Sequence, residues 1–237
     1  MTSVVQFSQN VNSKKQHFLK YLKRQFWRDR AIINRYFCQR EVKKLHIGCG
    51  WYTLKGWLNS DLEPCSNNII YLDAREPFPF PDESFHFIFS EHMIEHISYT
   101  EGLRMLNECC RVLKNKGKIR ISTPDLAFLI ELYRLDKSEL QSEYIRWATD
   151  SFIKSAPYYD DTFVINNFVR DWGHLFIYDE KTLRSSLEKA GFTSVTRWLL
   201  NKSDDDSLQN LENEERMPGG FLQLETLSLE GTKVRDI

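Results

Sequence analysis

Short apolar runs alternate with amphipathic segments from Val42 to the C-terminal residues. Apolar runs bounded by turn formers are typical of buried strands, whereas apolar positions repeating every three or four residues predict helices. The pattern predicts strands at about 43–47, 57–61, 68–72, 84–90, 118–122, 193–200 and 221–229. Helices are expected over 100–113 and between Asp179, a good N-cap residue, and Gly191, a good C-terminal stop. This alternation indicates an α/β fold with a mostly parallel sheet.

The connection between the first two strands is unusually short. Residues 51–56 alone separate the first strand end from the second strand. A crossover normally takes about ten or more residues when it contains a helix. We therefore expect an irregular loop at this point.

Two later segments break the alternation. Residues 125–173 are rich in Trp, Tyr and Phe and follow the fifth strand. An insertion after that strand would lie at the carboxyl edge of the sheet, where it could form a lid over a substrate or a satellite core. Residues 201–220 are polar and acidic and predict a mobile loop.

The N-terminal residues have the pattern of a basic amphipathic helix, over about 13–37. Its apolar stripe comprises Phe18, Leu19, Leu22, Phe26, Ile33, Tyr36 and Phe37, and its basic arc Lys20, Lys23, Arg24, Arg28 and Arg35. The basic excess is local, because the whole chain has a net charge of −1. We expect the stripe to pack on the following domain and the charges to face water. A surface for an anionic membrane or for nucleic acid is the alternative.

The cysteines and the hydropathy bear on the compartment. The chain has five cysteines and none forms a C-x-x-C pair, which favours reduced thiols over a disulfide framework. Neither a signal peptide nor an apolar run long enough to cross a bilayer is evident in the sequence. We therefore expect a cytoplasmic protein.

Glycines and acids stand at the ends of the first three predicted strands. The first strand ends in Gly48-Cys49-Gly50, the second in Asp61 and the third in Asp73. Glycines let backbone N–H groups approach a ligand closely, and a carboxylate at the next strand end can accept hydrogen bonds from a ribose diol. The sequence therefore predicts an adenosine-binding pocket at the carboxyl edge of the sheet.

Five segments in register resemble the class I S-adenosylmethionine-dependent methyltransferases, in particular a bacterial branch of the type-11 group. They are LHIGCG, GWLNSDLEP, YLDAREPFPFPDESFHFIFSEHMIEHI, ECCRVLKNKGKIRISTPDL and GHLFIYDEKTLRSSLEKAGF. The resemblance runs from about Val42 to Leu200. It implies a Rossmann-like fold with a central, mostly parallel seven-stranded sheet, and S-adenosylmethionine as the methyl donor. The methyltransferase domain would span residues 42–237, behind an extension of residues 1–41.

The resemblance also assigns the cofactor site. Gly48 and Gly50 would line the methionine and ribose part, Asp61 would hold the ribose hydroxyls, and Asp73 with Ala74 would face the adenine. The complete set it implies is His46, Gly48, Cys49, Gly50, Asp61, Leu62, Asp73, Ala74, Ser90, Glu91 and His92. His46 departs from the family pattern, because an acid usually stands there. Glu91 or a backbone carbonyl could hold the methionine amino group in its place.

His92, Glu95, His96 and His174 are the candidate catalytic residues. The first three have helical i, i+3, i+4 spacing, so we expect them on one helix face, with His174 joining them beside the transferred methyl group. Their role could be structural. They could instead hold a divalent metal, as Glu-x-x-Glu-His plus a later His does in ubiquinone-pathway O-methyltransferases and in small-RNA 3′-terminal 2′-O-methyltransferases. An inverted zinc-peptidase motif is the least favoured hypothesis.

Methyl transfer to an oxygen or nitrogen of a small molecule or sugar is the function we expect. His92 and His174 are the first candidates for the base, with Asp171, Tyr158 and Tyr178 in reserve. One alternative is a metal-assisted enzyme like the RNA 2′-O-methyltransferases, although neither a metal nor a nucleic-acid partner is favoured. Another is a non-catalytic module that binds the adenosine cofactor and uses the basic helix to bind nucleic acid or a membrane.

Overall fold

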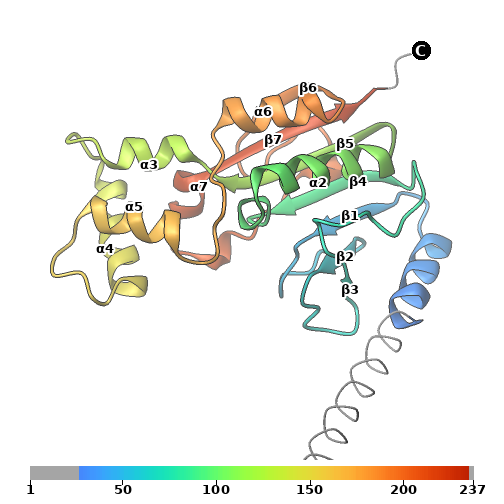
Figure 1. Ribbon diagram of the computed structural model, residues 1–237, viewed down its shortest axis with the longest axis horizontal. Helices are drawn as coiled ribbons and strands as arrows, with labels where there is room; N and C mark the ends of the chain where they lie inside the picture. The colour runs from blue at the N-terminus through green and yellow to red at the C-terminus, as the bar shows by residue number, and fades with distance from the viewer. Residues whose placement is uncertain (1–26, 235–237) are drawn as a thin grey trace, which may run out of the picture.

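A seven-stranded sheet forms the centre of the computed structural model, which describes residues 27–234. The strands are β1 Lys44–Ile47, β2 Leu58–Asp61, β3 Ile70–Tyr71, β4 Phe85–Glu91, β5 Leu113–Pro124, β6 Phe192–Trp198 and β7 Thr226–Lys233. Their order is β3-β2-β1-β4-β5-β7-β6 (Figure 1). Every neighbouring pair is parallel except those that involve β7, which runs antiparallel to β5 and β6. The predicted Rossmann-like fold is confirmed.

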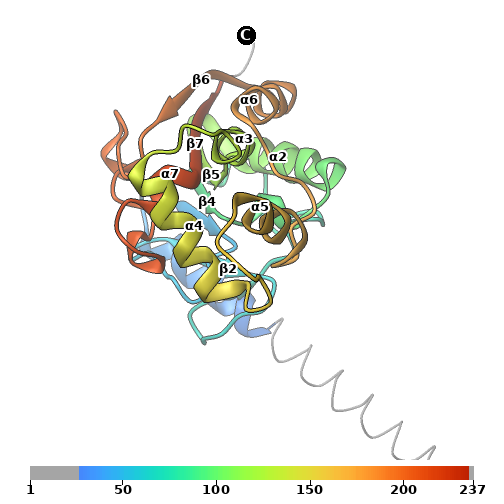
Figure 2. The same cartoon turned by 90° about the vertical axis from the view of Figure 1, so that its left-hand side faces the viewer.

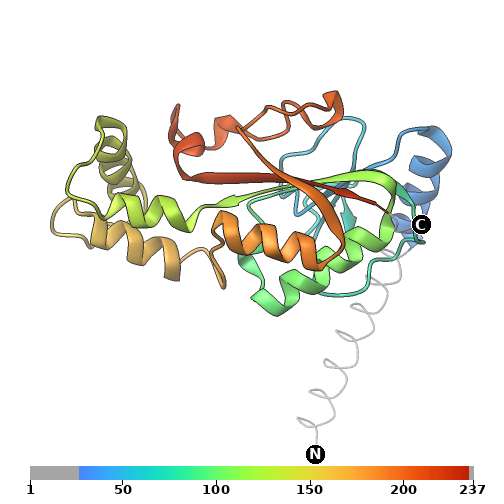
Figure 3. The same cartoon turned by 90° about the horizontal axis from the view of Figure 1, so that it is seen from above.

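The two faces of the sheet are covered differently. On one face, α2 (Tyr99–Val112) and α6 (Glu180–Lys189) lie over the main core (Figure 3). On the other face, the segment after β6 packs Leu208 and Leu211 against Phe89 of β4. Alternate residues of a strand point to opposite faces, so Ile88 and Phe89 contribute to separate cores.

The loop between β1 and β2 contains no helix, as predicted. Asn59 of β2 holds it through three hydrogen bonds. Its Oδ1 accepts from the Leu54 N–H at 2.9 Å, and its Nδ2 donates to the carbonyls of Leu54 at 3.1 Å and Trp57 at 3.3 Å. A side chain that pairs both backbone groups of Leu54 replaces the hydrogen bonds that a helix would provide.

The aromatic-rich insertion forms a helical arm beyond the carboxyl edge of the sheet (Figure 2). Its helices are α3 Leu126–Leu132, α4 Glu139–Phe152 and α5 Asp161–Arg170, each preceded by an N-cap side chain. Together with α7 (Phe221–Glu225) they enclose a second core that includes Phe128, Tyr144, Phe168 and Phe221. The expected satellite core is therefore present, while a lid function stays a prediction.

The predicted strand at 221–229 is wrong in its first half. Residues 221–225 form α7, and β7 begins only at Thr226. Gly220 has φ +87° and starts the helix, and Phe221 is buried in the core of the arm. Tertiary contacts with the arm thus decide in favour of a helix, although the apolar run is equally compatible with a strand.

The described part of the N-terminal helix, residues 27–39, packs against the main core through Ile32, Ile33, Tyr36 and Phe37. Arg28, predicted to face water, instead donates to Asp29 and to the Ile69 carbonyl at 3.1 Å, next to the edge strand β3. Arg35 is exposed, as expected, and the predicted positions Phe18, Leu19, Lys20, Leu22, Lys23, Arg24 and Phe26 lie outside the described residues. No helix within residues 27–234 is long and apolar enough to span a bilayer.

Candidate active site

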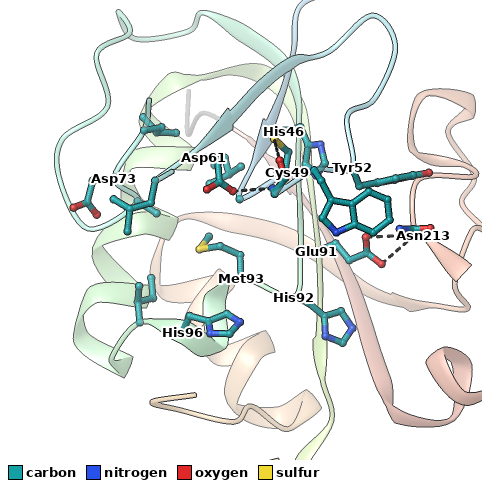
Figure 4. Close-up of a pocket in the computed structure, with 18 of the residues that line it drawn as sticks. His46, Cys49, Tyr52, Asp61, Asp73, Glu91, His92, Met93, His96 and Asn213 are labelled. Atoms are coloured by element: carbon teal, nitrogen blue, oxygen red, sulfur yellow. Dashed lines mark hydrogen bonds between the residues drawn. The ribbon is translucent and has the colours of Figure 1, made fainter. Parts of the chain in front are cut away.

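A cavity of about 610 Å³ opens at the carboxyl ends of β1, β2 and β4. The predicted cofactor residues that line it are His46, Gly48, Cys49, Gly50, Asp61, Leu62, Asp73, Ala74, Glu91 and His92. Ser90 is the exception, because its side chain is buried within the sheet and its Oγ has no hydrogen-bond partner among the described residues. Asp73, Asp61 and Glu91 follow one another from one end of the cavity to the other (Figure 4).

The glycine loop is shaped by two contacts. Gly48 has φ +70°, and a Cβ at this position would lie 2.3 Å from Cγ of Met93, which no side chain tolerates. Gly50 has φ +52° and donates its N–H to Oδ2 of Asp61 at 2.7 Å. The other Asp61 oxygen accepts from the Glu63 N–H at 2.8 Å. Each carboxylate oxygen can accept a second hydrogen bond, so Asp61 keeps capacity for a ribose hydroxyl.

Asp73 is held by Arg75. The guanidinium donates to both carboxylate oxygens, at 2.8 and 2.7 Å, and the Arg75 N–H adds a bond of 3.0 Å. These hydrogen bonds lower the pKa of Asp73, so this end of the cavity carries a carboxylate at neutral pH. The predicted contact with the exocyclic amine of adenine would therefore form beside this ion pair.

His46 cannot replace the acid that the family has at its position. Its Nδ1 lies 3.1 Å from Oδ1 of Asn59, and its ring packs on Phe89. Burial lowers the pKa of His46 to about 4, so the imidazole is neutral near pH 7. If the cofactor's ammonium group lies at this end of the cavity, a carboxylate other than residue 46 must bind it.

Glu91 provides a carboxylate at that end. It is buried, and its two oxygens accept from the Asn213 N–H at 3.1 and 3.3 Å. Burial raises the pKa of Glu91 to about 7. Arg216 approaches Glu91 Oε1 to 3.9 Å, and both Asn213 and Arg216 line the cavity. Sequence reasoning missed these two residues, because the loop that contains them has no periodic pattern and lies more than a hundred residues from β4.

The histidines after β4 do not share a helix face, contrary to the prediction. The His92 N–H still bonds to Ser122 O of β5 at 2.8 Å, and His92 has φ +46°. Only one 3-10 turn, Ile94–His96, fits before Ser98 starts α2 with a capping box. The strand pairing and the cap together leave too few residues for a helix.

Glu95, His96 and His174 nevertheless come together. The carbonyl of Glu95 accepts the N–H groups of Leu175 and Phe176 at 2.7 and 3.2 Å, which places the His174 ring 5.0 Å from the His96 ring. One potential ligand atom from each of the three residues lies within 4.8 Å of the others. His174 Nδ1 must donate to the Phe168 carbonyl at 2.7 Å, so its Nε2 is unprotonated when the ring is neutral.

The four candidate catalytic residues differ in their access to the cavity. His92 and His96 line it, whereas Glu95 and His174 do not. His92 Nε2 is 3.0 Å from Oγ1 of Thr226, and its Nδ1 is 3.5 Å from Glu95. Burial lowers the pKa of both His92 and His96 below the usual histidine value. The reserve candidates Tyr158, Asp171 and Tyr178 do not line the cavity.

Part of the chain matches a known protein family. Residues 59–121 match the type-11 family model, described as a methyltransferase domain. The search of the curated proteins finds no match. Solved structures with a similar chain include an S-adenosylmethionine-dependent methyltransferase from Archaeoglobus fulgidus (17% identity, 92% of this chain and 99% of that chain covered, TM-score 0.49). A methyltransferase from Thermotoga maritima, described as a possible histamine N-methyltransferase, has 19% identity, with 92% and 97% covered and a TM-score of 0.45.

A phosphoethanolamine N-methyltransferase from Haemonchus contortus, in complex with S-adenosylmethionine, is 14% identical, with 87% of this chain and 52% of that chain covered and a TM-score of 0.44. At these identities the structural similarities carry no statement about the acceptor. The matched domain includes β2 and β4 and extends into β5, and so holds the acidic strand ends described above. Residues 59–121 thus match the methyltransferase domain of the type-11 family, which supports the class I S-adenosylmethionine-dependent methyltransferase predicted from the sequence.

Proposed function

We propose that this methyltransferase acts on an oxygen or nitrogen of a small molecule or sugar. The main support for the proposed cofactor site is that Asp73, Asp61 and Glu91 follow one another along one cavity beside the glycine loop. In this arrangement Asp73 and Ala74 face the adenine, Asp61 holds the ribose, and Gly48 and Gly50 contact the methionine part. The transferred methyl group then lies toward His92 and His96.

Methyl transfer is an in-line displacement in which the sulfonium leaves as a neutral thioether. The protein must align the acceptor, exclude water and remove one proton. His96 is the base that we propose, because it lines the cavity and its lowered pKa keeps it neutral near pH 7. His92 is less suited, because its Nε2 lies 3.0 Å from Thr226 Oγ1 and its Nδ1 faces the Glu95 carboxyl group at 3.5 Å.

The acceptor enters beside the arm in this proposal. The rings of Phe152 and Trp172 are each 44% exposed and lie 5.0 Å apart, and the Trp172 ring is 5.6 Å from His174. Aromatic faces next to polar groups suit a ring-bearing small molecule. Of the basic residues that suggested nucleic acid or membrane contact, Arg28 pairs with Asp29, and Lys20, Lys23 and Arg24 lie outside the described residues.

Calorimetric titration with S-adenosylmethionine, S-adenosylhomocysteine and NAD tests the cofactor. We expect the first two to bind and NAD not to bind. An assay that detects S-adenosylhomocysteine release then tests sugars, phenols and amines as acceptors. In that assay His96→Ala should lower kcat and spare cofactor affinity. Strong binding to RNA or anionic vesicles without cofactor affinity would favour the non-catalytic module instead.

A metal-assisted reaction is the second candidate. It is favoured by the convergence of Glu95, His96 and His174, together with a fully buried Glu95 Oε1 that has no hydrogen-bond partner among the described residues. Two imidazoles and one carboxylate suit zinc, iron or manganese better than magnesium. A bound ion would lower the pKa of an acceptor hydroxyl. Elemental analysis and zinc titration test it, with His174→Ala expected to weaken zinc binding and His86→Ala, remote from the cluster, expected to leave it unchanged.

A further inference from the structure

Glu91 and Arg216 form an ion pair at one end of the cavity, and both side chains have hydrogen-bonding capacity left for a ligand. The guanidinium lies 3.9 Å from Glu91 Oε1, which is beyond hydrogen-bonding distance, and within residues 27–234 no other ion pair involves Arg216. A guanidinium has five N–H donors, so Arg216 retains the capacity to bind an anion. Arg75, the second arginine in the cavity wall, is already bonded to both oxygens of Asp73.

A chain of buried contacts fixes the position of Arg216. Arg120 of β5 donates its Nε–H to Oε1 of Glu212 at 2.6 Å, and Glu212 Oε2 accepts from the Asn201 N–H at 2.8 Å. Asn213, the next residue, donates its N–H to Glu91. Its side chain also accepts from the Glu215 N–H at 3.2 Å and starts a 3-10 turn, Glu214–Arg216.

The pair is complementary to a zwitterion. The amino-acid end of the methyl donor carries an ammonium and a carboxylate on the same carbon atom. Glu91 lies on the opposite side of Asp61 from Asp73 (Figure 4), which is where that end falls when the adenosine lies against Asp73 and Asp61. His46 is neutral, and the remaining hydrogen-bonding capacity of Asp61 is assigned to the ribose hydroxyls. Glu91 is thus the available carboxylate at this end.

We propose that Arg216 binds the carboxylate of the cofactor's methionine part while Glu91 binds its ammonium group. This inference rests on the proposed cofactor site and assigns a binding role to the loop between β6 and β7. The two charges of the ligand then complete the hydrogen bonding of both side chains. Arg216 thereby distinguishes the complete cofactor from adenosine compounds that lack the amino acid.

Calorimetry with two probes tests the proposal. S-adenosylhomocysteine has the amino-acid end, whereas 5′-methylthioadenosine keeps the adenosine and the thioether but lacks that end. Arg216→Met should weaken S-adenosylhomocysteine binding by roughly tenfold or more, the scale of a lost charge-assisted interaction, and change methylthioadenosine binding little. Glu91→Gln should show the same selectivity. Arg75→Met, the matched control at the adenine end, should weaken both probes by a similar factor.

The outcomes separate the inference from the cofactor site itself. If the unmodified protein binds neither probe, the cofactor site is wrong. If it binds both, and Arg216→Met weakens them equally or weakens neither, the assignment of Arg216 is overturned. Arg216→Lys controls for a change in loop structure caused by Arg216→Met. It keeps the positive charge and should restore part of the preference for S-adenosylhomocysteine. Circular dichroism establishes that each variant is folded.

Discussion

Single residues define the cavity through backbone conformation as much as through side-chain chemistry. Gly48 and Gly56 both have positive φ, +70° and +85°, but only Gly48 faces a crowded neighbour. At Gly48 a Cβ would meet Met93, whereas at Gly56 it would find no atom within 4 Å. Alanine substitutions at the two glycines therefore distinguish the effect of backbone strain from the effect of a steric clash with Met93.

Gly48→Ala should abolish measurable S-adenosylhomocysteine binding, because Met93, which lines the cavity, would have to shift to make room for the Cβ. Gly56→Ala, the matched control, should lower stability by about 1–2 kcal/mol through its left-handed backbone alone and leave affinity nearly unchanged. Thermal unfolding and calorimetry measure the two effects. Equal loss of affinity in both variants would show that strain, and not the Met93 contact, governs the loop.

Glu91 should make cofactor binding depend on pH. Its pKa is raised to about 7, and the charged groups around it are Arg216, Arg120, Glu212 and the nearby Tyr52. Only the ionised carboxylate attracts an ammonium, so binding below pH 7 requires a proton to be released. S-adenosylhomocysteine affinity should therefore rise between pH 6 and pH 8, approaching about tenfold per unit at the acid end. Glu91→Gln should flatten this dependence, which titrations at several pH values would measure.

At the scale of elements, most strands and the short loop after β1 were predictable, whereas the segment after β4 and the loop between β6 and β7 were not. The glycines that end the first strand, and the acids that close the next two apolar runs, are local signals, and the structure places Asp61 and Asp73 in the cavity wall. The helix expected for His92 fails because pairing with β5 extends through this residue. Asn213 and Arg216 reach the cavity because their loop contacts β4 and β5. Such contacts produce no periodic pattern in the sequence, so they could not be predicted from it.

The loop that contains Arg216 should depend on its buried anchor. Glu212→Ala leaves Arg120 with Glu230 as its remaining ion-pair partner among the described residues, and should lower the free energy of unfolding by about 3 kcal/mol. It should also weaken S-adenosylhomocysteine binding, because Asn213 follows directly. Lys118→Met, the control on the same strand, removes exposed pairs with Asp204 and Asp205 and should cost about 0–1 kcal/mol. Denaturant unfolding compares the two, and equal losses would rule out an anchoring role.

At the scale of the whole molecule, the chain joins two cores beside one cavity. The sheet core forms from alternating apolar positions that the sequence displays. The core of the arm joins residues from α3, α4 and α5 to Phe221, at the other end of the chain. Glu225 of α7, which is buried, connects the two cores. Its carboxyl group accepts a hydrogen bond from the Tyr144 hydroxyl of α4, and its backbone carbonyl accepts one from the Asp125 N–H at 2.8 Å.

Docking of the arm should weaken as pH rises through neutrality. Burial raises the pKa of Glu225 to about 7, with Tyr144, Arg216 and Glu95 as its titratable or charged neighbours. Because the folded pKa lies above the unfolded value of about 4.3, the native state holds the proton more tightly. The stabilisation is therefore complete below that unfolded value and declines as pH rises through 7. Hydrogen exchange, corrected for the intrinsic pH dependence, should show α4 and α5 opening more readily at pH 8 than at pH 6, relative to β4. Glu225→Gln keeps the shape without the charge and should remove this difference, whereas an unchanged difference in that variant would place the pH sensitivity elsewhere.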